Sequence, residues 1–265
     1  MAPSNNNTVR LFSDKYPVHG FLNRIIDIVH PSINTDFYKR NILPDNSINI
    51  VFPYAGEQTY PNTDNYFSTI RICGQLTQKK EYHTSISTRA IIVKLQPWAA
   101  GFFFKEPLHE LINANIPLSA IFPESKVKSL EDELKNTNDL LNVILKFLQA
   151  HLIEKSIDKG IFHSLQLIER NNGEIRVDKL ARSVYQSKRN FERKFRATMG
   201  LTPKQFIQNS RFQYALRMLK MGLPLLDVTY RSGYYDQSHF GADFKRITGL
   251  TPEQYECSNL SHFYY

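Results

Sequence analysis

The chain has 265 residues with a formal net charge of +8, and 42% of its residues are hydrophobic. This length suits about two domains, and no run approaches the roughly 18 apolar positions that a membrane-spanning helix needs. The amino terminus, MAPSNNNTVR, is polar and lacks the apolar segment of a secretory signal. Two cysteines, Cys73 and Cys257, match no metal-ligand spacing, so we expect a reduced, cytoplasmic protein without a metal site or cofactor.

Charge divides the chain into two parts. Residues 1–159 hold 17 Lys and Arg against 16 Asp and Glu, so this part is nearly neutral. Residues 160–265 hold 16 against 9, a balance of +7. A basic carboxyl-terminal part favours a polyanion as the partner of that part alone. A balance of +7 is only moderately basic, so the assignment of a polyanion partner depends on sequence motifs.

Residues 1–125 are predicted to form a β-rich domain. Apolar and polar residues alternate in short runs, and Pro53 is expected to end the first of them. We predict a barrel or sandwich with flanking helices, which would sense a ligand or mediate assembly. The expected strands cover Ser47–Phe52, Tyr66–Cys73 and Ala90–Leu95, and helical patterns flank them at Phe21–Val29 and Leu108–Ala114.

This domain shows no catalytic or metal-binding pattern. Its four histidines are scattered, and no phosphate loop, nucleophile elbow or zinc motif occurs, so we do not expect an enzyme. Aromatic residues are numerous enough to line a ligand pocket, although they could equally fill the core. Because successive strand residues alternate between faces, Phe102–Phe104 could not all face inward from one strand. The ligand-pocket candidates are Phe52, Tyr54, Phe67, Trp98 and Phe102.

A connecting helix is predicted over residues 126–152. Apolar residues recur there at spacings of three and four, with charged residues opposite. The apolar face would either pack on the β-rich domain or form the seam of a homodimer. Residues 153–160 are polar and charged and are expected to form a linker to the last domain, residues 161–258.

The last domain contains one pattern written twice. Residues 191–206 read FERKFRATMGLTPKQF and residues 240–255 read FGADFKRITGLTPEQY, at an offset of 49. Phe191 and Phe195 are four residues apart, so both rings lie on one face of a helix. A repeat at one offset indicates one supersecondary unit used twice.

The residues after each phenylalanine pair describe a helix end and a helix start. Gly200 can adopt the left-handed conformation that ends a helix. Thr202, Pro203 and Gln205 then supply an N-cap, a residue suited to the first helical position and a capping box. The segment Thr251–Gln254 repeats this arrangement.

A second short helix is predicted before each phenylalanine pair. In the first copy it covers Val177–Val184, and Ser187 suits the N-cap of the basic helix that follows. In the second copy it covers Leu225–Tyr230, with a break at Gly233 and an N-cap at Asp236. A helix, a tight turn and an N-capped helix form the helix-turn-helix layout, whose second helix can enter a major groove. The alternative is a plain helical bundle with a duplicated hairpin.

These residues resemble the AraC/XylS family of bacterial transcription regulators. The stretch Gly233–Phe240 with Phe244–Pro252 is similar to the family signature G-[FY]-x-D-x-S-H-F…F-K-x-x-x-G-x-[ST]-P, and Arg211–Leu219 is similar to its linker helix. The resemblance covers about residues 161–255. It implies seven helices, with two helix-turn-helix units joined by a long linker helix that we expect from Pro203 to about Lys220. The match of the amino-terminal part to a sensor-like domain is loose.

The resemblance also implies which side chains meet DNA. Arg193 could bond guanine, and Gln237 could pair with adenine, although either could instead contact phosphate or solvent. The base-contact candidates are Arg189, Glu192, Arg193, Gln237, Ser238 and Ala242. The phosphate candidates are Ser187, Lys188, Lys194, Arg196, His239, Lys245 and Arg246.

The chain departs from the family pattern in its second unit. Ala242 stands where arginine is common, Thr229 and Tyr230 replace smaller apolar residues, and Tyr234 replaces phenylalanine. We therefore expect the first unit to carry more of the sequence specificity.

The sequence as a whole predicts an α+β protein of two domains that regulates transcription, as an activator or a repressor, by binding specific duplex DNA. A nonspecific architectural DNA-binding protein is the first alternative. The second is an enzyme whose β-domain binds a metal or small molecule and carries a DNA-binding module. Besides duplex DNA, the candidate partners are RNA polymerase, a small-molecule effector and a second copy of the chain. No membrane partner is expected.

Overall fold

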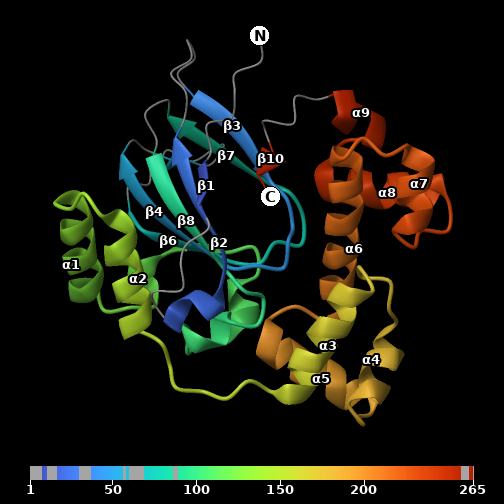
Figure 1. Cartoon of the computed structure of the whole chain (residues 1–265), viewed down its shortest axis with the longest axis horizontal. Coiled ribbons are helices and arrows are strands. Elements are labelled where there is room, and N and C mark those ends of the chain that lie inside the picture. Colours follow the sequence, from blue (N-terminus) through green and yellow to red (C-terminus); the bar gives the residue numbers. More distant parts are fainter. Residues whose placement is uncertain are drawn as a thin grey trace. The chain divides into compact units, whose positions relative to one another are not determined.

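The computed structural model describes residues 8–10, 17–29, 37–55, 58–59, 69–85, 89–257 and 263–264. The chain forms two compact units (Figure 1). The first unit comprises residues 1–40, 47–74 and 81–155, and the second comprises residues 41–46, 75–80 and 156–265. Within the described ranges, no helix has both the length and the apolar character needed to cross a membrane.

The first unit is built on a β-sheet of six strands, as the β-rich prediction requires. Its strand order is β1-β2-β8-β4-β6-β9, and neighbouring strands are antiparallel wherever their register is defined. In sheet order the strands are β1 (Thr8–Arg10), β2 (Leu22–Val29), β8 (Arg89–Leu95), β4 (Asn49–Ala55), β6 (Arg71–Cys73) and β9 (Asn115–Pro117). A second sheet contains β3 (Phe37–Ile42), β7 (Lys80–Ser85) and β5 (Gln58–Thr59).

Two sequence-based expectations for this sheet were wrong. The segment Phe21–Val29 is not a helix, because β2 occupies it after the 3-10 helix η1 (Pro17–Phe21). Its β-branched residues pair along β8 from Leu22 to Val29, and this long-range pairing outweighs the local helical spacing. Pro53 does not end β4, since the register shifts next to it and the strand continues to Ala55.

The aromatic run after β8 differs from expectation in a similar way. Phe102, Phe103 and Phe104 are all buried. The chain here is not a strand, because the 3-10 helix η2 (Ala100–Phe102) and the turn after it replace one, so the alternation of a strand does not apply. Two further 3-10 helices follow, η3 (Leu108–Leu111), where a helical pattern was expected, and η4 (Leu118–Ala120).

The predicted connecting helix is two helices, α1 (Glu124–Lys135) and α2 (Leu140–Ala150). The break covers residues 136–139, Asn-Thr-Asn-Asp, which are all weak helix formers. Asp139 begins α2 by accepting a hydrogen bond from the backbone amide of Asn142 at 3.2 Å. The apolar residues of both helices are mostly buried within the first unit, which favours packing over a dimer seam. The buried set is Val127, Leu130, Leu134, Val143, Ile144, Leu145 and Leu148.

The second unit holds seven helices within the described ranges, as the resemblance implied. A first helix-turn-helix consists of α4 and α5, a second consists of α7 and α8, and α6 joins them (Figure 1). The α6 bounds agree with the predicted linker helix. The helices are α3 (Lys159–Arg170), α4 (Val177–Ser183), α5 (Lys188–Met199), α6 (Pro203–Lys220), α7 (Leu225–Arg231), α8 (Gln237–Thr248) and α9 (Pro252–Cys257).

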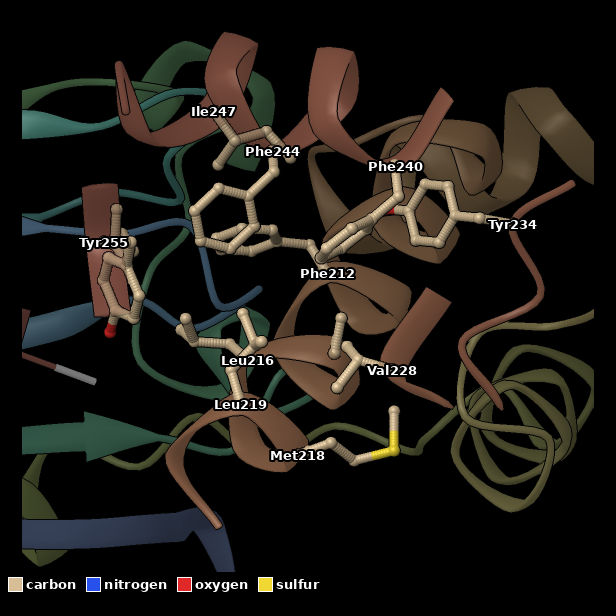
Figure 2. Close-up of a cluster of buried hydrophobic side chains, with 12 residues drawn as sticks. Phe212, Leu216, Met218, Leu219, Val228, Tyr234, Phe240, Phe244, Ile247 and Tyr255 are labelled. Carbon is tan, nitrogen blue, oxygen red and sulfur yellow. The ribbon is translucent and has the colours of Figure 1, made fainter. Parts of the chain in front are cut away.

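Phenylalanine pairs form the centre of each helix-turn-helix. In the first, the rings of Phe191 and Phe195 are 5.6 Å apart, and both side chains are fully buried. In the second, Phe244 lies 5.5 Å from Phe240, 5.6 Å from Phe212 and 5.4 Å from Tyr255 between ring centroids (Figure 2). The repeated sequence pattern is therefore the core of each unit.

Helix α6 belongs to both cores. Near its start Phe206 packs on Phe195 at 5.5 Å, and further along Phe212, Leu216 and Leu219 pack in the second cluster (Figure 2). Its buried residues consequently surround the helix instead of forming one stripe. This shared helix holds the two helix-turn-helix units in one body.

Two short segments from the amino-terminal half of the sequence belong to the second unit. Residues 41–46 are the last two residues of β3 and the loop that leads to β4, and residues 75–80 run from the loop after β6 to the first residue of β7. Leu43 is 1% exposed and is a member of the cluster around Phe244. The strand β10 (Phe263–Tyr264) also pairs here, parallel to Asn41 and Ile42.

Polar contacts fix these segments on α6. The Asn46 amide donates hydrogen bonds to the Phe206 carbonyl oxygen at 3.0 Å and to the Ser210 hydroxyl at 2.9 Å. Further bonds to α6 and between the segments join Asn209 to the Leu76 carbonyl at 3.1 Å, Gln213 to the Pro44 carbonyl at 2.6 Å, and Gln75 to the Asn46 carbonyl at 2.9 Å. Most of these groups are buried, so each bond prevents the cost of an unpaired polar group. We call residues 41–46 and 75–80 the α6 clamp.

Candidate nucleic-acid interface

The two recognition helices, α5 and α8, begin and end in the same way. Ser187 and Asp236 cap them by accepting hydrogen bonds from the amides of Asn190 at 3.4 Å and His239 at 2.7 Å. Gly200 and Gly249 end them with φ angles of 81° and 77°, a region that side chains disfavour. After these glycines, Thr202 with Gln205 and Thr251 with Gln254 form the expected reciprocal capping bonds.

The structure leaves the predicted DNA-contact residues accessible. Glu192 and Lys194 are half-buried, and every other base or phosphate candidate is exposed. These residues all lie on α5 and α8, except for Ser187, which caps α5. The basic side of α5 therefore faces solvent, as a surface for a polyanion must.

Arg193 on α5 is held in position by neighbouring amides. Its guanidinium Nη2 donates to Asn190 Oδ1 at 2.9 Å, and the Asn190 amide donates to Gln186 Oε1 at 3.2 Å. Lys188, at the start of the same helix, forms an ion pair with Asp178 of α4 at 3.3 Å. An oriented guanidinium loses less conformational freedom when it forms a bidentate bond.

A polar network stands beside α8. Arg246, a phosphate candidate, donates from Nη2 to Asp243 Oδ1 at 2.6 Å, and the Tyr234 hydroxyl donates to Asp243 Oδ2 at 2.9 Å. The Arg211 guanidinium lies over the Tyr234 ring, 4.4 Å from its centroid. Burial, and then the Asp243 carboxylate, raise the pKa of Tyr234 well above its ordinary range, so this hydroxyl remains a donor.

The Lys194 side chain is already engaged in an ion pair. Its Nζ lies 2.6 Å from Asp158 Oδ2, and Asp158 also caps α3 through the Ile161 amide at 2.9 Å. Burial acts to raise the pKa of Asp158, but the hydrogen bonds from Lys194 and the backbone outweigh it and lower the pKa. A phosphate at Lys194 would have to compete with this carboxylate.

Substituting Asp158 with alanine is expected to destabilise the second unit by about 1 kcal/mol at pH 7, because a helix cap is lost. Since the folded-state pKa lies below the unfolded value, the stabilisation is present above the ordinary aspartate range and is lost as pH falls through the lowered pKa. Urea unfolding at pH 7 and at pH 3 measures this. The control, Asp132→Ala, removes an exposed 3.9 Å pair with Lys135 and should cost less than about 0.5 kcal/mol. An equal loss of unfolding free energy at both pH values would contradict the role given to Asp158.

Sequence reasoning missed Tyr185, in the turn between α4 and α5. Its φ angle is 55°, and the residue is 99% exposed. The corresponding turn of the second unit uses Gly233, with φ 69°. Only an alignment of the two turns, in which the second is one residue longer, could have indicated the unusual backbone.

The first unit contains a small cavity of about 180 Å³ beside β2, β8 and the start of α2. None of the described pocket candidates lines it. Phe52 is core, Tyr54 donates to Asp27 at 2.8 Å, and Trp98 packs on Phe21 and Phe102 at 5.3 and 5.8 Å. Phe67 lies outside the described residues. The cavity-lining residues are Ile25, Asp27, Ile91, Asn138, Asp139, Leu140 and Leu141.

No group of three or more histidine, cysteine, aspartate or glutamate side chains in the described ranges could hold a metal ion. His83, for example, lies beside a carboxylate. Its Nε2 lies 3.1 Å from Glu81 Oε1 within the same strand.

Each part of the chain matches a known family model. Residues 180–257 match the family described as a helix-turn-helix domain, and residues 16–117 match a domain of unknown function, DUF6597. No curated protein matches the sequence. The family match confirms the resemblance drawn from the repeated motif for the carboxyl-terminal domain.

Several solved structures resemble the chain. ToxT from Vibrio cholerae shares 13% identity with a TM-score of 0.46, over 88% of this chain and 96% of ToxT. The C-terminal domain of AraT from Geobacillus stearothermophilus shares 20% identity with a TM-score of 0.37, over 40% and 89%. The DNA-binding domain of the global transcriptional factor AdpA, in complex with a target DNA, shares 25% identity with a TM-score of 0.36, over 38% and 92%.

Proposed function

We propose that this chain, which carries an AraC-type helix-turn-helix domain at residues 180–257, regulates transcription by binding specific duplex DNA. One observation supports the proposal most directly. Two N-capped helices, α5 and α8, expose polar first turns from a single body that α6 holds together. Two such helices on one rigid frame suit two successive major-groove segments.

In this proposal α5 carries most of the specificity. Arg193 is exposed, positively charged and oriented by Asn190, so it suits a bidentate contact with guanine O6 and N7. On α8, Gln237 and Ser238 are exposed but Ala242 has no polar group, so fewer bases are read there. Arg196 and Lys245 are among the exposed cations that would bind phosphates.

The amino-terminal unit would modulate DNA binding through the α6 clamp. Both clamp segments continue directly into strands of the first unit, namely β3, β4, β6 and β7. An effector that binds two arrangements of these strands with different affinity would therefore bias the position of α6. The proposal assigns no catalytic reaction. It places the protein in the cytoplasm with DNA, and RNA polymerase, an effector or a second copy remain proposed partners.

Selection of binding sites from random duplex DNA tests the proposal. We expect strong enrichment of one sequence that spans two successive major-groove segments, with a specific affinity at least about 10³-fold above nonspecific binding. A flat enrichment profile with equal affinity for all duplexes would instead identify an architectural DNA-binding protein.

Substituting Arg193 with alanine should weaken binding to the selected site by about 1–3 kcal/mol and relax the preference at one base pair. Arg196→Ala on the same helix is the matched control, since it removes an equal charge from a phosphate candidate. It should weaken binding to all duplexes alike and leave the base preference unchanged. Competition binding against single-base variants of the site separates the two results. Unchanged discrimination in Arg193→Ala would contradict the assignment of Arg193.

A further inference from the structure

A basic groove lies between the first helix-turn-helix and helix α6, with a volume of about 590 Å³. The turn before α4, the first residues of α4, the first residue of α5 and the first half of α6 line it. Two carboxylates, Glu174 and Asp178, are among its lining residues. Its cationic residues are Arg176, Lys179, Lys188, Lys204 and Arg211.

The groove has more positive charge than its own carboxylates neutralise. Asp178 already pairs with Lys188 at 3.3 Å and with Arg176 at 3.6 Å. Lys179 and Lys204 are exposed and have no carboxylate partner among the described residues. A concave surface with surplus cations and low-dielectric walls concentrates an anionic partner.

Arg211 is held in a fixed position in the groove. Its guanidinium lies over the Tyr234 ring at 4.4 Å, while its Nε is buried and has no hydrogen-bond partner in the described chain. The opposite wall is packed tightly, since a Cβ placed on Gly173 would lie 2.5 Å from the Arg211 backbone nitrogen. Both contacts fix Arg211 in its place at this end of the groove.

The groove also lies between the starts of the two recognition helices. Lys188 is the first residue of α5. On the other side, the Glu174 side chain packs against Gly233, since a Cβ there would lie 2.8 Å from Glu174 Cγ, and Gly233 stands three residues before the N-cap of α8. A duplex read by both helices must pass one sugar-phosphate strand across this position.

We propose that this groove binds the DNA backbone between the two major-groove segments, with Lys179 and Lys204 contacting phosphates and Arg211 completing the site. The choice of duplex DNA as the partner of this groove rests on the proposed function. It adds a third contact region that carries no base information and sets the register of the two reading helices on the duplex.

The test is the double variant Lys179→Ala with Lys204→Ala in the full chain. Both residues are exposed, so the fold should be retained, and circular dichroism checks this. Losing two phosphate contacts should reduce the slope of log affinity against log salt by about 2 and weaken binding at 0.15 M salt by roughly 10- to 30-fold. Selected and scrambled duplexes should lose the same factor. The control, Lys126→Ala with Lys128→Ala, removes two exposed lysines from α1 and should change neither quantity.

Phosphate ethylation interference then locates the contact. Ethylation at the centre of the selected site should impair binding of the native protein but not of the double variant. An unchanged salt slope, or interference that persists in the double variant, would overturn the groove proposal. So would a double variant that binds DNA normally but loses thermal stabilisation by inorganic phosphate, which would identify a small-anion site. If the native protein shows no sequence preference, the proposed function fails, while the salt slope still reports on the groove.

Discussion

Substituting Leu43 with alanine should destabilise the carboxyl-terminal unit by about 2–5 kcal/mol, although the residue lies in the amino-terminal half of the sequence. Leu43 is 1% exposed and packs with Phe244 and its neighbours. Removing its side chain leaves a cavity beside α6 and loosens the α6 clamp. Hydrogen exchange measured by mass spectrometry should show lost protection in α6 and α8, together with weaker DNA binding.

A matched substitution separates this effect from general destabilisation. Leu134 of α1 is also buried, at 7% exposure, but belongs to the first unit. Leu134→Ala should therefore reduce protection in α1 and α2 and leave α6 and α8 unchanged. If Leu43→Ala spared α6 and α8, the clamp would not be part of the second unit.

Replacing Phe244 with alanine is expected to cost about 3–5 kcal/mol and to abolish specific DNA binding. Its ring contacts Phe212, Phe240 and Tyr255, with centroids 5.4–5.6 Å away, and each aromatic pair adds stabilisation beyond the buried area. Loss of this central ring removes the support of α8 on α6 (Figure 2). Urea unfolding and binding to the selected site measure the two effects.

Tyr230 provides the control for Phe244. It lies on α7 in the same helix-turn-helix, but 60% of it is exposed. Tyr230→Ala should change the free energy of unfolding by no more than about 0.5 kcal/mol. A cost similar for both substitutions would mean that the aromatic cluster does not hold the unit together.

The repeated motif allowed the carboxyl-terminal fold to be predicted because its signals are local. Ser187 and Asp236 cap helices within three residues of themselves, and the start of α6 followed from Thr202 and Pro203. Positions such as Arg193 could be expected on an exposed face from helical spacing alone. Their contacts with DNA remain predictions.

Features that depend on distant contacts could not be predicted in this way. The strand β2 has a helical spacing of apolar residues, and only its pairing with β8 makes it a strand. Leu43 gave no sign of packing on Phe244, about 200 residues further along the chain. The basic groove was missed for the same reason, since Lys179 and Lys204 come from separate helices that meet only in the folded domain.

The placement of α6 inside two clusters has a consequence for how the domain can lose structure. Unfolding of either helix-turn-helix would remove the packing from one side of α6 and expose Phe206 or Phe212 to water. An intermediate in which only one helix-turn-helix is folded is therefore high in free energy. We expect both units to unfold in a single cooperative step. The protein would then bind its DNA site through both helix-turn-helix units or through neither.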